Sequence, residues 1–414
     1  MSRARLDGVK MLHHDEMRNY ARIQSKMLEV LMKHGCKIVE PPSFADYDIY
    51  GQFFPHLRRE MVKTIDADGS VLVLRPDATL PIVETAAREF PRTNQLLKFG
   101  YVSTVFRKYS GRSTYGKDFL QGGAEILGDP EPECDGEIIA MAAAVLAAVG
   151  ICNIHIDIGT AAYAYALFDE LSLDKEAKQV LRRYLGERNL VAYRGYTALL
   201  PLRSDCRRAL DALPVLFGPY AETLTAARTY CLNSGMRNAL ARLEKTHQYL
   251  GCAGYTSHIR LDLGVTDPLG YYTDMMFKIY ADEALCELVS GGRYDRLSTA
   301  FGIERPACGF GMNLNLLYEF MSDAGLLKDA EPSLQLAVSY STYDRQLLID
   351  LFNWRRRGFR VAAYPDTAYI DAGDCRLCCR YGDGVYHKDG NILTARELEE
   401  FMRRCDDGSS YCPS

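Results

Sequence analysis

The sequence predicts an α+β protein, in which a mostly antiparallel sheet is flanked by helices and a small α/β domain follows. Strand-like stretches recur along the first part of the chain and resume after about residue 250. Between about residues 165 and 250 the sequence is charged and has a helical period, which predicts a helical insertion. After residue 330 strand-like and helical stretches alternate, which is typical of a small α/β domain. We therefore expect a core over residues 1–330 and a C-terminal domain over residues 331–414.

The first predicted element is an amphipathic helix over residues 15–35, which ends near Gly35. Its apolar side chains fall on one face: Tyr20, Ile23, Met27, Val30 and Leu31. KIVEPPSF then predicts a strand that two prolines stop. MVKTI and VLVL flank DADG, an Asp/Gly turn that predicts a β-hairpin. Further strands are predicted at LLKFGYVSTVF, KDFLQGGAEILG and ICNIHIDIG.

The later elements follow the same two patterns. The apolar, Ala-rich run over residues 138–152 predicts a buried helix, because a membrane span needs roughly 18 residues. LDKEAKQVLRRYLGERN and NALARLEKTHQYL predict helices of the insertion, and HIRLDLG and YYTDMMFKIY predict strands after it. In the last domain we expect a strand at LQLAVSYS, a helix at YDRQLLIDLFNWRRRG that Gly358 closes, and a strand at FRVAAYP.

The composition is that of an ordinary soluble globular protein. Hydrophobic residues make up 48% of the 414 residues and charged residues 25%. The net charge of −5, without a long basic run, gives no electrostatic reason to expect general nucleic-acid binding. The first ten residues contain no apolar signal region, so we expect a cytoplasmic protein that does not span a membrane.

Cysteine usage supports the same location. Thirteen cysteines are scattered over the chain, and we expect reduced thiols rather than a disulfide framework. Cys375, Cys378 and Cys379 form one tight group, with His387, Cys405 and Cys412 downstream. A zinc site would need a second close pair, which Cys405 and Cys412 are too widely spaced to supply. The favoured interpretation is therefore a set of thiols on a strand, and metal binding by this group stays open.

Four separated stretches carry polar residues at specific positions: LRPDATLP, VFRKYSGRSTYGKDFLQGGAEILG, LGYYTDMMF and SGGRYDRL. In this order they resemble the motifs of class II aminoacyl-tRNA synthetases, and of histidyl-tRNA synthetase in particular. The resemblance covers about residues 7–320, and it is specific because four motifs agree. It implies the class II synthetase-like antiparallel sheet with flanking helices.

The resemblance also implies a site for free histidine, whose imidazole titrates near pH ~6.5. Asp77 and Thr79 match positions that hold the ammonium group, and Glu125 matches the acceptor of an imidazole nitrogen. Gln121 and Glu125 lie four residues apart on a predicted strand, so they share a face. The match places Tyr272 against the imidazole ring and Tyr271 close by. The candidate histidine-binding residues are Asp77, Thr79, Arg107, Gln121, Glu125, Tyr271 and Tyr272.

Other positions depart from the synthetase pattern. Where the third synthetase motif ends in an arginine for ATP phosphates, this chain has Leu316, preceded by Asn315 in place of an acid. Where the synthetase pattern has an arginine before the L-x-YYT strand, this chain has Asp267. Where the pattern has an acid two positions after the motif 2 arginine, this chain has Tyr109. Only Arg107 remains of three arginines, so Arg107 or Arg293 is the candidate partner of a histidine carboxylate.

These losses decide the expected activity. Each lost oxyanion-type donor costs about 10²–10³ in rate, so amino-acid activation should be abolished. We therefore predict no catalytic residues, no metal and no cofactor in the core.

A histidine site without activation chemistry resembles the family of ATP phosphoribosyltransferase regulatory subunits. The family implies a short catalytic subunit of that enzyme as partner, L-histidine as feedback inhibitor, and no tRNA. It also implies a homodimer within a hetero-octamer. Two alternatives remain open: a diverged histidyl-tRNA synthetase, and a pseudo-synthetase binding module for another partner. The role of residues 331–414 is also open.

Overall fold

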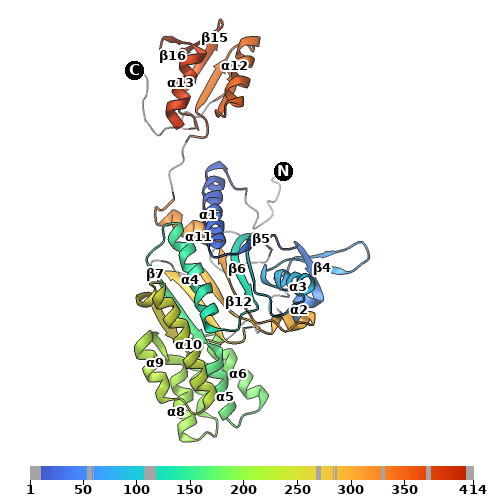
Figure 1. Ribbon diagram of the computed structural model, residues 1–414, viewed down its shortest axis with the longest axis vertical. Coiled ribbons are helices and arrows are strands. Elements are labelled where there is room, and N and C mark those ends of the chain that lie inside the picture. Colours follow the sequence, from blue (N-terminus) through green and yellow to red (C-terminus); the bar gives the residue numbers. More distant parts are fainter. Residues whose placement is uncertain are drawn as a thin grey trace, which may run out of the picture. The chain divides into compact units, whose positions relative to one another are not determined.

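The computed structural model describes two compact units, Met1–Leu327 and Lys328–Ser414 (Figure 1). Each unit has its own hydrophobic core. The described residues are 11–53, 58, 60–106, 118–266, 272–282, 284, 287–327, 332–369 and 374–406.

A nine-stranded mixed sheet forms the centre of the N-terminal unit, in the order β1-β5-β6-β12-β11-β10-β7-β9-β8. Neighbouring strands are antiparallel except for the pairs β1–β5 and β7–β9. The strands are β1 (Lys37–Ile38), β5 (Leu97–Val105), β6 (Phe119–Leu127), β7 (Ile154–Thr160), β8 (Phe217–Pro219), β9 (Ile259–Asp262), β10 (Met275–Ala281), β11 (Val289–Arg293) and β12 (Ala307–Asn313). Every strand that sequence analysis predicted for this sheet is present, and the class II synthetase-like fold is confirmed.

Helices cover one face of this sheet and bury its larger core. They are α1 (His14–Lys33), α4 (Pro132–Ala148), α10 (Ser234–Cys252) and α11 (Leu314–Asp323). The five apolar side chains predicted for the first helix are all buried on α1. Helix α4 is buried along most of its length, as the Ala-rich run predicted, and packs against Ile126 of β6 and Phe310 of β12.

A smaller layer covers part of the other face. The predicted hairpin is present as β3 (Lys63–Ile65) and β4 (Val71–Leu74), and β2 (Phe44–Asp46) extends it into three strands. Helices α2 (Tyr47–Phe53) and α3 (Thr79–Glu89) and the 3-10 turn η4 (Leu297–Phe301) belong to this layer. Its core contains Tyr50, Leu80 and Val83 together with Phe99 and Tyr101 of β5.

The predicted insertion is helical, with one exception. It contains α5 (Ala161–Glu170), α6 (Lys175–Gly186), α7 (Leu190–Ala198), α8 (Ser204–Ala212), α9 (Tyr220–Thr229) and α10, with short 3-10 turns η2 (Leu213–Val215) and η3 (Thr256–His258). These helices gather at one end of the unit (Figure 1). The exception is β8, which pairs with β9 at the sheet edge. Sequence analysis missed it because three residues are too few for a periodic signal.

The C-terminal unit is built on a five-stranded sheet in the order β14-β13-β15-β16-β17. Its elements are β13 (Leu336–Tyr340), α12 (Arg345–Arg356), β14 (Val361–Pro365), β15 (Cys378–Gly382), β16 (Val385–Lys388), β17 (Asn391–Leu393) and α13 (Ala395–Asp406). The predicted strand, helix and strand are the first three of these elements. Gly358 has φ +91° just after α12, so it closes the helix as expected.

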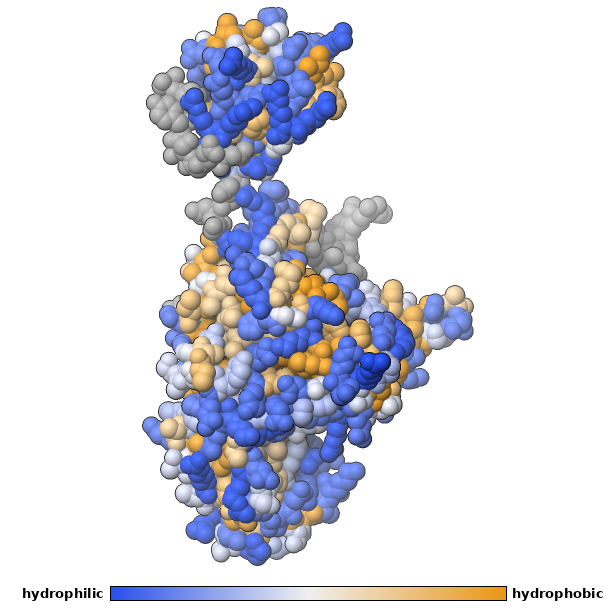
Figure 2. Space-filling view, in the orientation of Figure 1, coloured by the Kyte–Doolittle hydropathy of each residue, from blue (hydrophilic) through white to orange (hydrophobic). Residues whose placement is uncertain are grey.

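Exposed apolar side chains occur along the whole described chain, and some of them lie on the first elements of the N-terminal unit. Met17 and Met32 lie on α1, Ile38 on β1 and Phe44 on β2. In Figure 2 hydrophobic residues gather on the visible face in the region of α1 and the main sheet.

Candidate functional site

The candidate site lies on the face of the main sheet opposite α4. Gln121 and Glu125 are both on β6 and share this face, as their spacing predicted, because side chains alternate along a strand. Glu125 is paired with Gly309 of β12 and with Phe99 of β5. Tyr101 of β5 stands on the same face, opposite Gly123.

Glycines on the neighbouring strands leave room for these side chains. A Cβ on Gly309 would overlap Oε2 of Glu125, and one on Gly311 would lie 2.5 Å from Nε2 of Gln121. On β11, a Cβ on Gly292 would lie 2.8 Å from Cδ1 of Tyr272. The glycine-rich stretch at residues 309–311 therefore forms a floor beneath polar side chains.

Helix α3 brings two more of the predicted residues to this floor. Thr79, the first residue of α3, donates its hydroxyl proton to Oε1 of Glu125 over 2.7 Å. Asp77 precedes the helix, and its Oδ1 accepts a hydrogen bond from the amide of Leu80 over 3.0 Å. The hydroxyl of Tyr50 donates to the backbone carbonyl of Asp77 over 3.3 Å. The start of α3 is thus fixed next to Glu125.

Glu125 is the most deeply buried acid of this group, with 1% of its surface exposed. Burial raises its pKa to about 8. Hydrogen bonds from the hydroxyls of Tyr294 and Thr79 oppose this rise, and the charge of Asp77 adds to it. The carboxyl is therefore mostly protonated at pH 7, so it can share a proton with a weak base.

Sequence analysis missed Tyr294 and Tyr101. Tyr294 donates its hydroxyl to Oε2 of Glu125 and is almost fully buried. Burial, and then the charges of Glu125 and Asp77, raise the pKa of Tyr101 well above its usual value. The sequence carries a signal for Tyr294, since this residue stands inside the GGRYD stretch between Arg293 and Asp295. Tyr101 had no sequence signal beyond its place on a predicted strand.

The structure brings five of the seven predicted residues together. Asp77, Thr79, Gln121, Glu125 and Tyr272, with Tyr101 and Tyr294, are called the polar cluster below. Oε1 of Gln121 is buried and has no hydrogen-bond partner among the described residues. Arg107 and Tyr271 lie outside the described residues, as do Asp267 and Tyr109.

The suggestion that Arg293 meets a ligand carboxylate is wrong. Its side chain is 1% exposed and donates to Oδ1 of Asp135 over 2.7 Å, to the carbonyl of Asp129 over 2.9 Å and to Oδ1 of Asp295 over 3.1 Å. Asp135 is fully buried and also pairs with Arg242. Arg293 therefore serves a buried ion-pair network, since a buried guanidinium needs such partners.

Asn315 and Leu316 stand at the first turn of α11, where the synthetase pattern has charged residues. Asn315 is 5% exposed, and its Oδ1 accepts a hydrogen bond from the amide of Leu120 over 2.9 Å. Asn313 caps the helix by accepting from the amides of both residues. Asn315 thus joins α11 to β6, and the half-buried Leu316 contributes no charge there.

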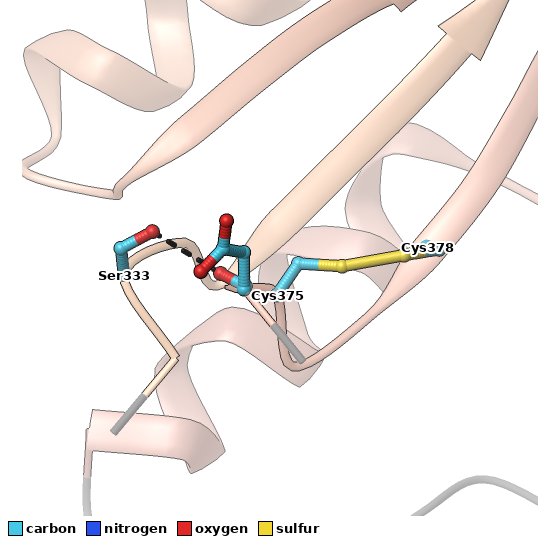
Figure 3. The surroundings of a disulfide bond; sticks show 4 residues. Ser333, Cys375 and Cys378 are labelled. Atoms are coloured by element: carbon cyan, nitrogen blue, oxygen red, sulfur yellow. Dashed lines mark hydrogen bonds between the residues drawn. A yellow bond between two sulfur atoms is a disulfide. The ribbon is translucent and has the colours of Figure 1, made fainter. Parts of the chain in front are cut away.

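The cysteine group differs from the expectation of reduced thiols. Cys375 and Cys378 form a disulfide bond in the C-terminal unit (Figure 3). Cys379 is free and buried, because it points to the opposite face of β15. Within the described ranges, no group of three or more His, Cys, Asp or Glu side chains is arranged to hold a metal ion.

Comparisons with known proteins agree with the fold. A histidyl-tRNA synthetase family model matches residues 8–317. The chain is 34% identical over 351 residues to an ATP phosphoribosyltransferase regulatory subunit of Bacillus licheniformis, covering 84% of this chain and 88% of that protein. It is 33% identical to the Bacillus subtilis protein of the same name, with the same coverage.

Solved structures give the same result. A Bacillus halodurans structure described as an ATP phosphoribosyltransferase regulatory subunit/histidyl-tRNA synthetase has a TM-score of 0.81 and 27% identity, covering 92% of this chain and 99% of that one. Histidyl-tRNA synthetase from Nostoc shares the fold at 17% identity, with a TM-score of 0.74 and coverage of 98% and 100%.

The fold and the motifs define a protein of the histidyl-tRNA synthetase type, as the sequence predicted. Within that class, the chain belongs to the family of ATP phosphoribosyltransferase regulatory subunits. None of the helices in the described ranges is long and apolar enough to cross a membrane.

Proposed function

We propose that this chain is the non-catalytic regulatory subunit of ATP phosphoribosyltransferase, which performs the first step of histidine biosynthesis. It supports a short catalytic subunit that makes phosphoribosyl-ATP from ATP and phosphoribosyl pyrophosphate. It binds L-histidine in the polar cluster and so mediates feedback inhibition. The names of its relatives support the regulatory role.

The observation that carries the histidine assignment is the environment of Glu125. Its carboxyl is buried above Gly309 and is held by the hydroxyls of Thr79 and Tyr294. A pKa of about 8 leaves it with a proton at pH 7, next to the position that the resemblance gives to an imidazole. An imidazole titrates near pH ~6.5, so the two groups can share one proton in a short hydrogen bond.

Other members of the cluster suit the remaining groups of histidine. Asp77 carries a carboxylate suited to an ammonium group, and Gln121 offers a buried oxygen as acceptor. By resemblance, Arg107 meets the histidine carboxylate. Tyr272, which packs over Gly292, supplies an aromatic surface for the imidazole ring.

We further propose that two copies pair through the elements around residues 17–43, and that this homodimer is the core of a hetero-octamer. The exposed apolar side chains of α1, β1 and β2 are compatible with this pairing, because two copies that meet there would bury them. Inhibition then requires that histidine bind one arrangement of the complex more tightly than the other. A coupling free energy of ~1–3 kcal/mol would change the apparent substrate requirement or the turnover by roughly 5–150-fold.

The test combines this chain with a purified short catalytic subunit. We expect the two chains to co-elute in size-exclusion chromatography and histidine to inhibit phosphoribosyl-ATP formation. In calorimetry Glu125→Ala should weaken histidine binding by about 1.5–3 kcal/mol, because an imidazole nitrogen loses its partner. Glu287→Ala is the matched control, since Glu287 forms an exposed ion pair with Lys278 at the end of the same sheet.

Separate elution of the chains, with catalysis indifferent to this protein, would refute the regulatory assignment. Inhibition that survives Glu125→Ala would leave the assignment of the partner intact but would place the histidine site elsewhere.

The alternative of a diverged histidyl-tRNA synthetase is favoured by the name of the matching family model. It requires histidine-dependent pyrophosphate exchange with ATP, which we expect to be absent. A binding module for another partner would bind histidine without joining the catalytic subunit.

A further inference from the structure

One pair of cysteines differs from every other described cysteine. Cys375 and Cys378 are joined by a disulfide, whereas eight other described cysteines are free. The pair is separated by two residues in the stretch CRLC, a spacing found in redox-active dithiols. Among the described cysteines, oxidation is therefore confined to one pair.

The two sulfurs have unequal access to solvent. Cys378 is the first residue of β15 and is exposed, whereas Cys375 is 6% exposed. The adjacent Cys379 points into the core of the unit, and burial raises the pKa of its thiol to about 12. An external thiolate can therefore attack the sulfur of Cys378, and Cys379 stays protonated and does not compete.

Two arginines flank the exposed Cys378. Arg376 lies between the two cysteines in the sequence, and Arg380 follows Cys378 on the same face of β15, where it pairs with Asp366 over 2.8 Å.

The disulfide loop also holds the segment through which the chain enters the C-terminal unit. Leu334, just before β13, forms a parallel β-bridge with Cys375. Its amide donates to the carbonyl of Asp374 over 3.0 Å, and the amide of Arg376 donates back to Leu334 over 3.0 Å. The hydroxyl of Ser333 also donates to the carbonyl of Asp374 over 3.2 Å (Figure 3).

We propose that Cys375 and Cys378 form a reversible dithiol–disulfide site, which exchanges with small thiols such as glutathione and controls how firmly residues 333–334 are held. In reduction, a glutathione thiolate attacks the sulfur of Cys378 and the Cys375–Cys378 bond breaks. Cys375 leaves as a thiolate and takes a proton from solvent. A second glutathione thiolate attacks the glutathione sulfur of the mixed disulfide and releases Cys378. Two glutathione molecules thus become one glutathione disulfide, and the protein gains two thiols.

Reduction removes the covalent constraint on the loop of residues 375–378. Only the hydrogen bonds of the loop then oppose its opening. The chain-entropy relation for a loop this short makes its opening about 20-fold more favourable after reduction. Leu334 should open with it, because its backbone partners in the described part of the unit are Asp374, Cys375 and Arg376, whereas the carbonyl of Ser333 also accepts a hydrogen bond from Nε of Arg360 over 3.0 Å.

The experiment equilibrates the full-length protein in glutathione buffers of stepped reduced-to-oxidised ratio, then alkylates free thiols and quantifies each cysteine by peptide mass spectrometry. We expect Cys375 and Cys378 to convert together in one two-electron transition, while Cys152, an exposed free cysteine, is alkylated under reducing conditions without a linked partner. Amide hydrogen exchange at Leu334 and Arg376 should rise by up to about 20-fold in the reduced form, with β16 unchanged. Cys378→Ser should exchange at the reduced rate in every buffer, and Cys152→Ser should follow the unmodified protein.

Three outcomes would overturn the proposal. The first is that both thiols stay alkylatable at every ratio, and the second is that the bond survives the most reducing buffer. The third is that the pair converts while hydrogen exchange at Leu334 and Arg376 stays constant. The titration of the unmodified protein decides the first two even where Cys378→Ser does not fold.

Discussion

Glu125 carries the chemistry of the polar cluster because it is an acid in a place that disfavours charge. Burial opposes its ionisation more than the hydroxyls of Thr79 and Tyr294 favour it, and Asp77 adds repulsion. The buried Glu125 carboxyl lowers the stability of the histidine-free protein at neutral pH. A bound imidazole would offer a second acceptor for the proton of this carboxyl. Strongly shifted acids of this kind are typical of functional sites.

The raised pKa leads to a pH-dependent stability. Below pH 4.5, the usual pKa, the carboxyl is protonated in the folded and unfolded states and contributes no difference. Between pH 4.5 and about 8 the unfolded state loses the proton while the folded state keeps it, so the free energy of unfolding falls. Glu125→Gln should abolish this fall, which is at most about 5 kcal/mol. Urea unfolding without histidine at pH 5, 6.5 and 8 measures it.

In that comparison Glu287→Gln should follow the unmodified protein at all three pH values. If the free energy of unfolding of Glu125→Gln fell with pH as it does in the unmodified protein, the conclusion that Glu125 is protonated at neutral pH would be wrong. The same variant should also lose affinity for histidine, because an amide cannot give up a proton to an imidazole.

At the scale of elements, two glycine-containing strands determine where the cluster can exist. β11 and β12 place Gly292, Gly309 and Gly311 beneath Tyr272, Glu125 and Gln121. Glycine in a strand interior weakens a sheet and often marks close approach of another group. Here the approaching groups are side chains of the cluster itself.

Gly309→Ala should therefore damage the cluster more than Gly311→Ala. A Cβ at 309 would overlap the Glu125 carboxyl and lie 2.8 Å from the carbonyl oxygen of Ala124, which is backbone and cannot move aside. At 311 the nearest atom is the end of the Gln121 side chain, which can shift. We expect Gly309→Ala to cost about 1–3 kcal/mol of stability and at least tenfold in histidine affinity. Thermal unfolding and calorimetry measure the two effects.

Gly195→Ala is the matched control. Gly195 lies in α7 with nothing within 4 Å of an added Cβ, so alanine should stabilise that helix by about 0.5–1 kcal/mol and leave histidine affinity unchanged. Equal effects of the substitutions at 309 and 311 would show that the floor does not position Glu125.

At the scale of the whole molecule, the chain consists of two units with separate cores, and the whole polar cluster belongs to the N-terminal one. The C-terminal unit buries Trp354, Tyr381 and Leu398 in a core of its own. Separate cores predict separate cooperative unfolding.

Calorimetric unfolding should therefore show two transitions, of which histidine shifts only one. A ligand present at 100 times its dissociation constant stabilises the unit that binds it by about 2.7 kcal/mol. We expect that shift in the transition that a chain ending at Leu327 retains, and none in the other. A shift of both transitions by the same amount would mean that the units unfold as one.

Much of this organisation was predictable from local signals. The apolar face of α1, the hairpin of β3 and β4 and the shared face of Gln121 and Glu125 each follow from a repeat of 3.6 or 2 residues. The motif order predicted the synthetase-type fold and brought Asp77 and Thr79 to the same site. These features were predictable because each depends on neighbours in sequence or on a pattern kept within a family.

Other features depend on contacts between distant residues, and only the tertiary structure decided them. Whether Arg293 was free to meet a ligand depended on Asp135, 158 positions away in sequence. The hydroxyl of Tyr294 reaches Glu125 across 169 positions. The strand β8 exists only because β9 is beside it. By itself, the sequence determined which residues could do chemistry, because that depends on side-chain type. The fold decided which of them are buried, paired or near a ligand position, because burial and pairing depend on which strands and helices meet.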